Sequence, residues 1–216
     1  MSESDEDTPT LSADTLAALQ MFYSEQSLQH QKAQVAYELG NVTNINIQED
    51  WQLSQFWYTE NTATRLAQEA LAVARPDGRI ACLSSPTAYK TIKSLCPEGC
   101  LVKCLEYDTR FSIYGDDFQF FDYKDPLNLP LEWKHSFDVV IVDPPFLSEE
   151  CLCRMAVTAK FLTKDKIILC TGMVMEAMAE KLLGAKLCTF IPRHTNQLQN
   201  EFRCYTNYDA IHLNDT

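Results

Sequence analysis

The segment "FDVVIVDPPF", residues 137–146, places four consecutive β-branched aliphatic residues before an acid, two prolines and an aromatic ring. A short, wholly apolar run of this kind is typical of a strand that is buried on both faces, as in the parallel sheet of an α/β protein. The prolines end the strand, because proline has no backbone N–H to donate to a neighbouring strand. The segment therefore predicts a buried parallel strand that ends at Asp143.

Similar strand signals occur on both sides of this segment and alternate with helix-compatible stretches. Such alternation predicts a doubly wound α/β domain with crossover helices, followed by a closing pair of antiparallel strands. The other expected parallel strands are "RIACLSS" (79–85), "LVKCLEYD" (101–108), "FQFFDY" (118–123) and "KIILCTG" (166–172). Helices are expected at 60–74, 86–96, 149–163 and 175–184, and the closing strands within 185–194 and 201–209.

The N-terminal part of the chain differs from this domain. Residues 1–10 are acidic and polar, so we expect them to be disordered. Residues 11–26 have apolar groups at helical spacing, and Ser12 or Asp14 can cap the helix. Residues 30–48 show no period and are predicted to be a mobile linker. The expected organisation is an acidic tip (1–10), an N-terminal helix with its linker (11–48) and one α/β domain (49–216).

Composition excludes several classes of protein. No apolar run reaches the roughly 18 residues of a membrane helix, and the N-terminus lacks signal-peptide features, so we expect a cytoplasmic protein that does not enter membranes. Nine cysteines, several in apolar surroundings and none in a Cys-x-x-Cys pair, favour reduced thiols and no metal site. The net charge of −12 disfavours nucleic acid and suits a basic partner.

Acidic residues end the second and third expected strands. In open α/β sheets the ligand lies beyond the carboxyl ends of the strands, where a carboxylate can accept hydrogen bonds from both hydroxyls of a ribose. Glu106 is the first candidate for this contact and Asp108 the second, while Asp122 could accept the amino group of an adenine. Each acid taken singly has an ordinary explanation, because Asp and Glu are common where strands turn.

The Asp-Pro-Pro-Phe tetrad has a more specific chemistry. Asp143 offers acceptor oxygens, and the carbonyl of Pro144 is held in one direction because the following proline fixes the turn. Two acceptors that converge on one point can hold the N–H bonds of an amine, while Phe146 provides a flat face beside it. We therefore expect Asp143, Pro144 and Phe146 to bind and orient a nitrogen nucleophile.

This tetrad resembles the [Asn/Asp]-Pro-Pro-[Tyr/Phe] signature of S-adenosylmethionine-dependent amino methyltransferases, which have a Rossmann-like seven-stranded sheet with helices on both faces. The chain from about residue 10 to 209 resembles one subgroup more closely, on "WQLSQFWYTENTATRLAQEAL", "LEYDTRFSIYGDDFQFFDY", "FDVVIVDPPFLSEECL" and "NEFRCYTNYD". That subgroup comprises lysine methyltransferases of translation elongation factor 1-alpha, formerly classed as N6-adenine DNA methyltransferases. The resemblance implies S-adenosylmethionine as cofactor and this elongation factor as substrate.

The resemblance also bears on two stretches near the expected cofactor. It implies that "QFWYT" lies near the methionine end, through Tyr58 and Thr59, whereas Phe56 and Trp57 can equally be core residues. The loop after the first strand departs from the family pattern, because "SSPTA" (84–88) has no glycine. The hydroxyls or backbone amides of Ser84 and Ser85 would then have to meet the cofactor.

Three functions remain open on the sequence. A lysine methyltransferase agrees with the whole-chain resemblance and the acidic charge. An adenine methyltransferase on DNA or RNA should carry clustered Lys and Arg near its site. The only such signals in this sequence are the short motifs "PRH" and "FR" late in the chain. A non-catalytic cofactor-binding module would explain the missing glycine but not the intact tetrad.

The oligomeric state is a separate expectation. Because the sequence shows no surplus apolar helix face, we expect a monomer.

Overall fold

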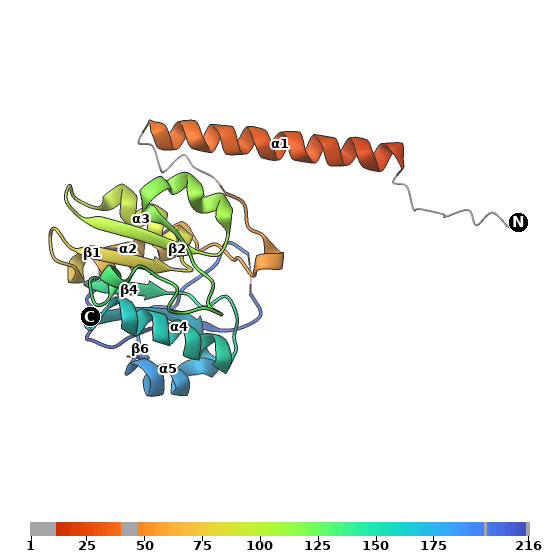
Figure 1. Ribbon diagram of the computed structural model, residues 1–216. Coiled ribbons are helices and arrows are strands. Elements are labelled where there is room, and N and C mark those ends of the chain that lie inside the picture. Colours follow the sequence, from red (N-terminus) through yellow and green to blue (C-terminus); the bar gives the residue numbers. More distant parts are fainter. Residues whose placement is uncertain (1–11, 40–46, 197, 215–216) are drawn as a thin grey trace, which may run out of the picture. The chain divides into compact units, whose positions relative to one another are not determined.

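The computed structural model describes residues 12–39, 47–196 and 198–214 (Figure 1). The chain divides into two compact units, residues 1–45 and 46–216. The expected disordered tip, residues 1–10, lies outside the described residues.

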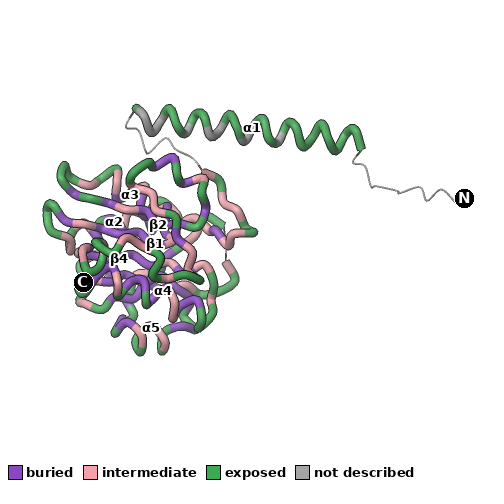
Figure 2. The backbone as a smooth tube through the Cα atoms, in the orientation of Figure 1, coloured by how far each residue is buried: buried purple, intermediate pink, exposed green. Residues whose placement is uncertain are grey.

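Helix α1 (Ala13–Glu38) is the described part of the first unit. Ser12 caps it, since its Oγ accepts a hydrogen bond from the backbone N–H of Thr15 at 3.2 Å. The helix continues to Glu38, past the point where the loss of apolar periodicity predicted a linker. Its described apolar side chains, including Leu16 and Leu19, are exposed (Figure 2). Residues of high helix propensity such as Ala, Gln, Lys and Glu explain why it continues without an apolar face.

The second unit is built on a seven-stranded sheet in the order β3-β2-β1-β4-β5-β7-β6. Strands β1 to β5 are parallel, and β7 runs antiparallel to both β5 and β6, as the alternation and the closing pair predicted. The strands are β1 (Arg79–Leu83), β2 (Leu101–Glu106), β3 (Phe118–Phe120), β4 (Val139–Val142), β5 (Lys166–Gly172), β6 (Lys186–Leu187) and β7 (Phe202–Thr206).

Helices cover both faces of this sheet, as expected. The α-helices are α2 (Glu60–Val73), α3 (Pro86–Leu95), α4 (Glu149–Leu162) and α5 (Glu176–Leu183), and the short 3₁₀ segments are η2 (Trp51–Leu53), η3 (Thr109–Asp117), η4 (Leu131–Trp133) and η5 (Met173–Met175). Helices α2 and α3 contact one another on one face, while α4 and α5 pair on the other (Figure 1). The crossover between β2 and β3 is the 3₁₀ segment η3 in place of an α-helix.

The core explains why the "VVIV" run forms a central strand. All four residues of β4 are fully buried, because the strand lies between β1 and β5 and has helices over both faces. Val140 and Val142 face the side of α4, where they pack with Leu152 and Met155. Buried residues are concentrated along the central strands in Figure 2.

Two consequences concern the function. Because β1 to β4 are parallel, their carboxyl ends meet at one edge of the sheet, which brings together the loops that follow Leu83, Glu106, Phe120 and Val142. Within the described ranges, no helix combines the length and apolar character needed to cross a membrane.

Candidate active site

A cavity of about 520 Å³ opens at this carboxyl edge. Its walls come from the loops after β1, β2, β3 and β4, from residues 52–58 and from the segment 194–202. All sequence-predicted site residues line it except Asp108 and Thr59. The lining residues that had been predicted are Tyr58, Ser84, Ser85, Glu106, Asp122, Asp143, Pro144 and Phe146.

Glu106, the last residue of β2, presents a buried carboxyl group to this cavity. Its Oε1 accepts the backbone N–H groups of Tyr107 at 3.0 Å and Asp108 at 3.3 Å. Its Oε2 has no donor among the described residues. Burial raises the pKa of Glu106 to about 7, against the lowering effect of the two N–H groups. One carboxyl oxygen is thus fixed by the backbone, and the other is left for a ligand.

Asp108, the second candidate for the same role, is used within the protein. It is buried outside the cavity lining and forms an ion pair with Arg110, whose Nη2 lies 2.6 Å from its Oδ2. Gln55 Nε2 donates to the same oxygen at 2.9 Å. Burial acts to raise the pKa of Asp108, but these donors outweigh it and the pKa is lowered. Asp108 therefore holds the loop after Glu106 and leaves no oxygen facing the cavity.

The glycine-free loop after β1 is accommodated by a serine in an uncommon conformation. Ser84 has a φ of +54°, in the left-handed region that glycine usually occupies. Its N–H donates to the carbonyl of Leu105 at 2.8 Å, which fixes the loop against β2. Ser85 then begins α3 with Pro86 at the first helical position, and its side chain forms no capping hydrogen bond with any described residue. The first turn of α3 faces the cavity through Pro86 and Thr87, and the backbone N–H groups of a first helical turn have no partner within the helix.

Asp143 and Pro144 follow β4, and both line the cavity. The backbone N–H of Asp143 donates to the carbonyl of Leu83 at 3.0 Å, which extends the β1–β4 pairing by one residue and fixes the main chain at Asp143. Burial raises the pKa of Asp143 to about 7, while the neighbouring Tyr58 hydroxyl lowers it and the charge of Glu106 raises it. Tyr58 is itself buried, and its hydroxyl makes no well-formed hydrogen bond with the described residues.

An aromatic pair stands beside the tetrad. Phe146 is 45% exposed, and its ring centroid lies 5.7 Å from that of Tyr123 at an interplanar angle of 58°. Asp122, the other predicted acid, uses Oδ1 to accept the backbone N–H of Lys124 at 2.8 Å. The cavity therefore carries three carboxyl groups together with aromatic walls.

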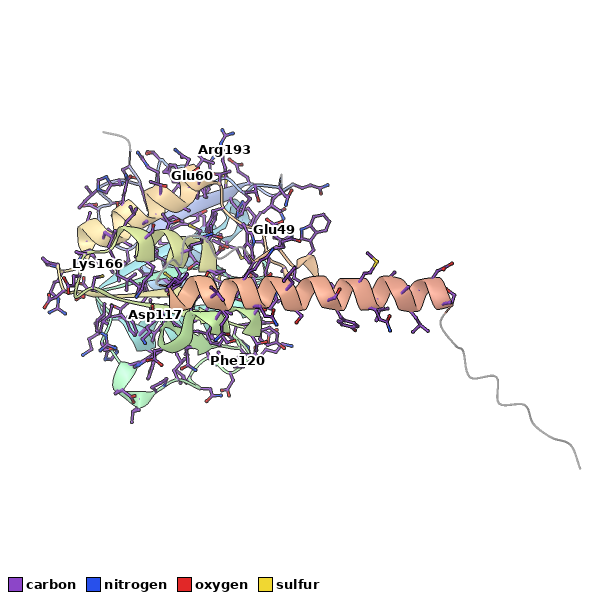
Figure 3. The ribbon with its side chains drawn as sticks, turned by 90° about the horizontal axis from the view of Figure 1, so that it is seen from above. Glu49, Glu60, Asp117, Phe120, Lys166 and Arg193 are labelled. Carbon is purple, nitrogen blue, oxygen red and sulfur yellow. The ribbon has the colours of Figure 1, made fainter. Side chains whose placement is uncertain are left out.

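Tyr58 and Thr59 are held in place by a distant part of the chain. Tyr58 forms an isolated antiparallel bridge with His194, and their rings lie 5.0 Å apart. Thr59 caps α2 through its side chain and is not among the residues that line the cavity. Glu49 accepts the backbone N–H of Trp57 at 2.7 Å and the Thr195 hydroxyl at 3.0 Å. Figure 3 shows Glu49 far from Lys166, the first residue of β5 and thus at the opposite edge of the sheet.

His194 is a site residue that sequence reasoning missed. It lines the cavity and packs against Phe202 with ring centroids 4.8 Å apart. Burial lowers its pKa to about 4, against the opposing charge of Glu49, so the ring is neutral at physiological pH. The sequence signal was the "PRH" triplet, which suggested only a weak basic patch. Within the described part of the chain, no group of three or more His, Cys, Asp or Glu is placed to hold a metal ion.

Comparison with solved structures supports this architecture. A branched-chain polyamine synthase from Thermus thermophilus, in complex with N4-aminopropylspermidine and 5'-methylthioadenosine, superposes with a TM-score of 0.56. The match covers 79% of this chain and 62% of that one at 12% identity, so it concerns the fold alone.

Comparison of sequences is more specific. The family model described as "Probable N6-adenine methyltransferase" matches residues 49–210. The human EEF1A lysine methyltransferase 1 is 54% identical over 95% of this chain and 95% of its own length. A protein-lysine N-methyltransferase of Caenorhabditis elegans is 42% identical over 98% of this chain and 99% of its own. The chain therefore belongs to the family of protein-lysine N-methyltransferases that includes EEF1A lysine methyltransferase 1.

Proposed function

We propose that this chain transfers a methyl group from S-adenosylmethionine to a lysine side chain of translation elongation factor 1-alpha. The observation that carries the proposal is the cavity that Asp143, Pro144 and Phe146 line together with Glu106, at the carboxyl ends of β4 and β2. Relatives whose names state this activity support it over nearly the full chain.

The residues present fit S-adenosylmethionine. The unpaired Oε2 of Glu106 is suited to the ribose hydroxyls. Ser84 supplies the left-handed turn that glycine usually makes, and the first turn of α3 offers N–H groups to a carboxylate. When bound, this cofactor supplies a methyl group on a positively charged sulfur.

Asp143 and Pro144 would hold the incoming amine. Their oxygens can accept its N–H bonds and direct its lone pair, while Phe146 and Tyr123 flank the aliphatic part of the lysine. A free lysine has a pKa of about 10.4, so it arrives largely protonated. A carboxylate whose pKa is raised to about 7 is a better proton acceptor than an ordinary aspartate, because a general base is most effective with a pKa near the working pH.

Adenine methylation on DNA or RNA is the alternative class, and the name of the matching family model gives the reason to test it. Against it, the described cavity wall carries the carboxyl groups of Glu106, Asp122 and Asp143 and a single lysine, Lys124. A phosphate backbone requires the opposite balance of charge. A non-catalytic module is disfavoured by the intact tetrad at the cavity.

The experiment is transfer of labelled methyl from S-adenosylmethionine by the purified chain, with elongation factor 1-alpha, DNA and RNA offered separately. Asp143→Ala is the control. Label on the elongation factor that disappears with Asp143→Ala supports the proposal. Label on nucleic acid would instead establish the adenine reaction, and cofactor binding without any transfer would identify the non-catalytic module.

A further inference from the structure

Two consecutive apolar residues, Met173 and Val174, stand exposed immediately after β5. Met173 is 43% and Val174 79% exposed, although the six residues of β5 before them, Ile167–Gly172, are buried. We propose that these two residues, with Glu176, form a docking surface for the protein substrate, called the β5 rim. Its occupant is a surface of the substrate that presents an apolar side chain and basic groups beside the target lysine. The inference rests on the proposed function and extends it.

The β5 rim adjoins the mouth of the cavity. Strands β4 and β5 are parallel neighbours, so their carboxyl ends lie at the same edge. A Cβ built on Gly172 would lie 3.0 Å from the side chain of Leu147, which lines the cavity. Gly172 also pairs in register with Phe202, another lining residue. The rim therefore follows directly in the chain from a residue that contacts the cavity wall, next to the site that a substrate lysine would enter.

The rim is held firmly by the backbone. The N–H of Met173 donates to the carbonyl of Glu201 at 2.7 Å, which joins the rim to the segment before β7. Met175, the next residue but one, turns inward and is buried against the α4 and α5 side of the core. Met173 and Val174 thus remain outside through a fixed turn, and a preformed surface loses little entropy on binding.

A single exposed apolar residue is ordinary, but Met173 and Val174 are accompanied by further apolar residues at the cavity. Phe146, 45% exposed, lies on the adjoining wall of the cavity, and Leu147 connects it to Gly172. Exposed apolar side chains on both sides of a cavity wall are typical of a surface that is covered when a partner binds.

The charges around the rim select a basic partner. Glu176 begins α5 and Glu149 begins α4, both are exposed, and neither forms an ion pair with any residue in the described ranges. Two nearby acids differ, because Glu150 pairs with Arg154 and Glu201 with Arg203. The uncompensated carboxylates of Glu149 and Glu176 are therefore available to Lys or Arg groups of the substrate.

A matched pair of variants tests the apolar part. Val174→Asn removes an apolar side chain from the rim. Leu131→Asn removes one at a position outside the rim that is equally exposed, since Leu131 is 77% and Val174 79% exposed. Leu131 lies in η4, which leads into the start of β4 and hence to the opposite edge of the sheet. Steady-state methylation of folded elongation factor 1-alpha should show a KM raised about tenfold for Val174→Asn with kcat nearly unchanged. Leu131→Asn should match the wild type.

A second pair tests the charge. Glu176→Gln should weaken the rise of KM with salt concentration, while Glu132→Gln, in η4 at the far edge, should leave that salt dependence unchanged. Cofactor affinity and thermal unfolding, measured on all four variants, should stay at wild-type values because these side chains are exposed.

The outcomes separate this inference from the proposed function. If the wild type methylates the elongation factor and Val174→Asn behaves as Leu131→Asn does, the docking surface is wrong and the function stands. If the wild type transfers methyl only to nucleic acid or not at all, the proposed function fails first. If light scattering shows a dimer that Val174→Asn dissociates without changing KM, the rim binds a second copy of the chain and the inference is overturned.

Discussion

Tyr123 and Phe146, which follow two different strands of the sheet, pack with ring centroids 5.7 Å apart at the mouth of the cavity. The contact joins the loop after β3 to the loop after β4, so it links the acid Asp122 to the Asp143 tetrad. The exposed edge of Phe146 is the part that can meet a lysine side chain.

Phe146→Ala should raise the KM for the protein substrate and lower kcat about tenfold, because the lysine loses one wall of its channel. Phe146→Tyr should retain most of the activity, since the ring is preserved. Steady-state kinetics on both variants check this. Wild-type kinetics for Phe146→Ala would show that the ring serves only to pack against Tyr123.

Glu106→Gln should weaken cofactor binding and remove its pH dependence. With the pKa of Glu106 raised to about 7, the carboxylate that we propose as the acceptor of the ribose hydroxyls forms as the pH rises through 7. Affinity of the wild type should therefore increase about tenfold between pH 6 and 8. Calorimetric titration of the cofactor at several pH values measures this affinity. The control is Asp143→Asn, in which the cofactor affinity should still increase with pH. An equal pH dependence in Glu106→Gln would remove the ribose role.

The same shift makes a prediction about stability. The folded state binds the proton of Glu106 more tightly than the unfolded chain, so this group lowers the free energy of unfolding as the pH rises from about 4.5 to about 7. Glu106→Gln should thus be more stable than the wild type at pH 8, by up to about 3 kcal/mol, and the gain should vanish near pH 4. Urea unfolding at the two pH values tests the sign. A variant that is less stable at pH 8 would contradict it.

Asp108→Asn should destabilise the domain by roughly 1–3 kcal/mol, because it leaves the Arg110 guanidinium without its buried anionic partner. Cofactor affinity should change much less than in Glu106→Gln. Chemical denaturation and cofactor titration on the two variants make the comparison. If Asp108→Asn lost cofactor affinity while keeping its stability, the assignments of the two acids would have to be exchanged.

Much of the sheet could be predicted from local pattern. The strands around β1, β4 and β5 are short apolar runs whose burial follows from their central position, and Asp143 and Glu106 follow from where those runs end. Local pattern was a poor guide to the length of α1, because the apolar period ends at residue 26 whereas residues of high helix propensity continue the helix to Glu38.

The remaining parts of the site depend on contacts between distant residues. The residues around Ser84 do not predict its φ of +54°, because the conformation depends on the hydrogen bond that the loop makes to Leu105. His194 reaches the cavity through its bridge to Tyr58, far away in the sequence. Asp108 and Thr59 were plausible by position, but Arg110 and the start of α2 occupy them in the fold.

The most direct test of the central claim is mass spectrometry of elongation factor 1-alpha after incubation with S-adenosylmethionine and either the wild type or Asp143→Ala. We predict added methyl mass on a lysine side chain with the wild type and none with Asp143→Ala, while both proteins show the same circular dichroism and bind the cofactor. Undiminished lysine methylation by a folded Asp143→Ala would contradict the assignment of the tetrad as the site that holds the amine.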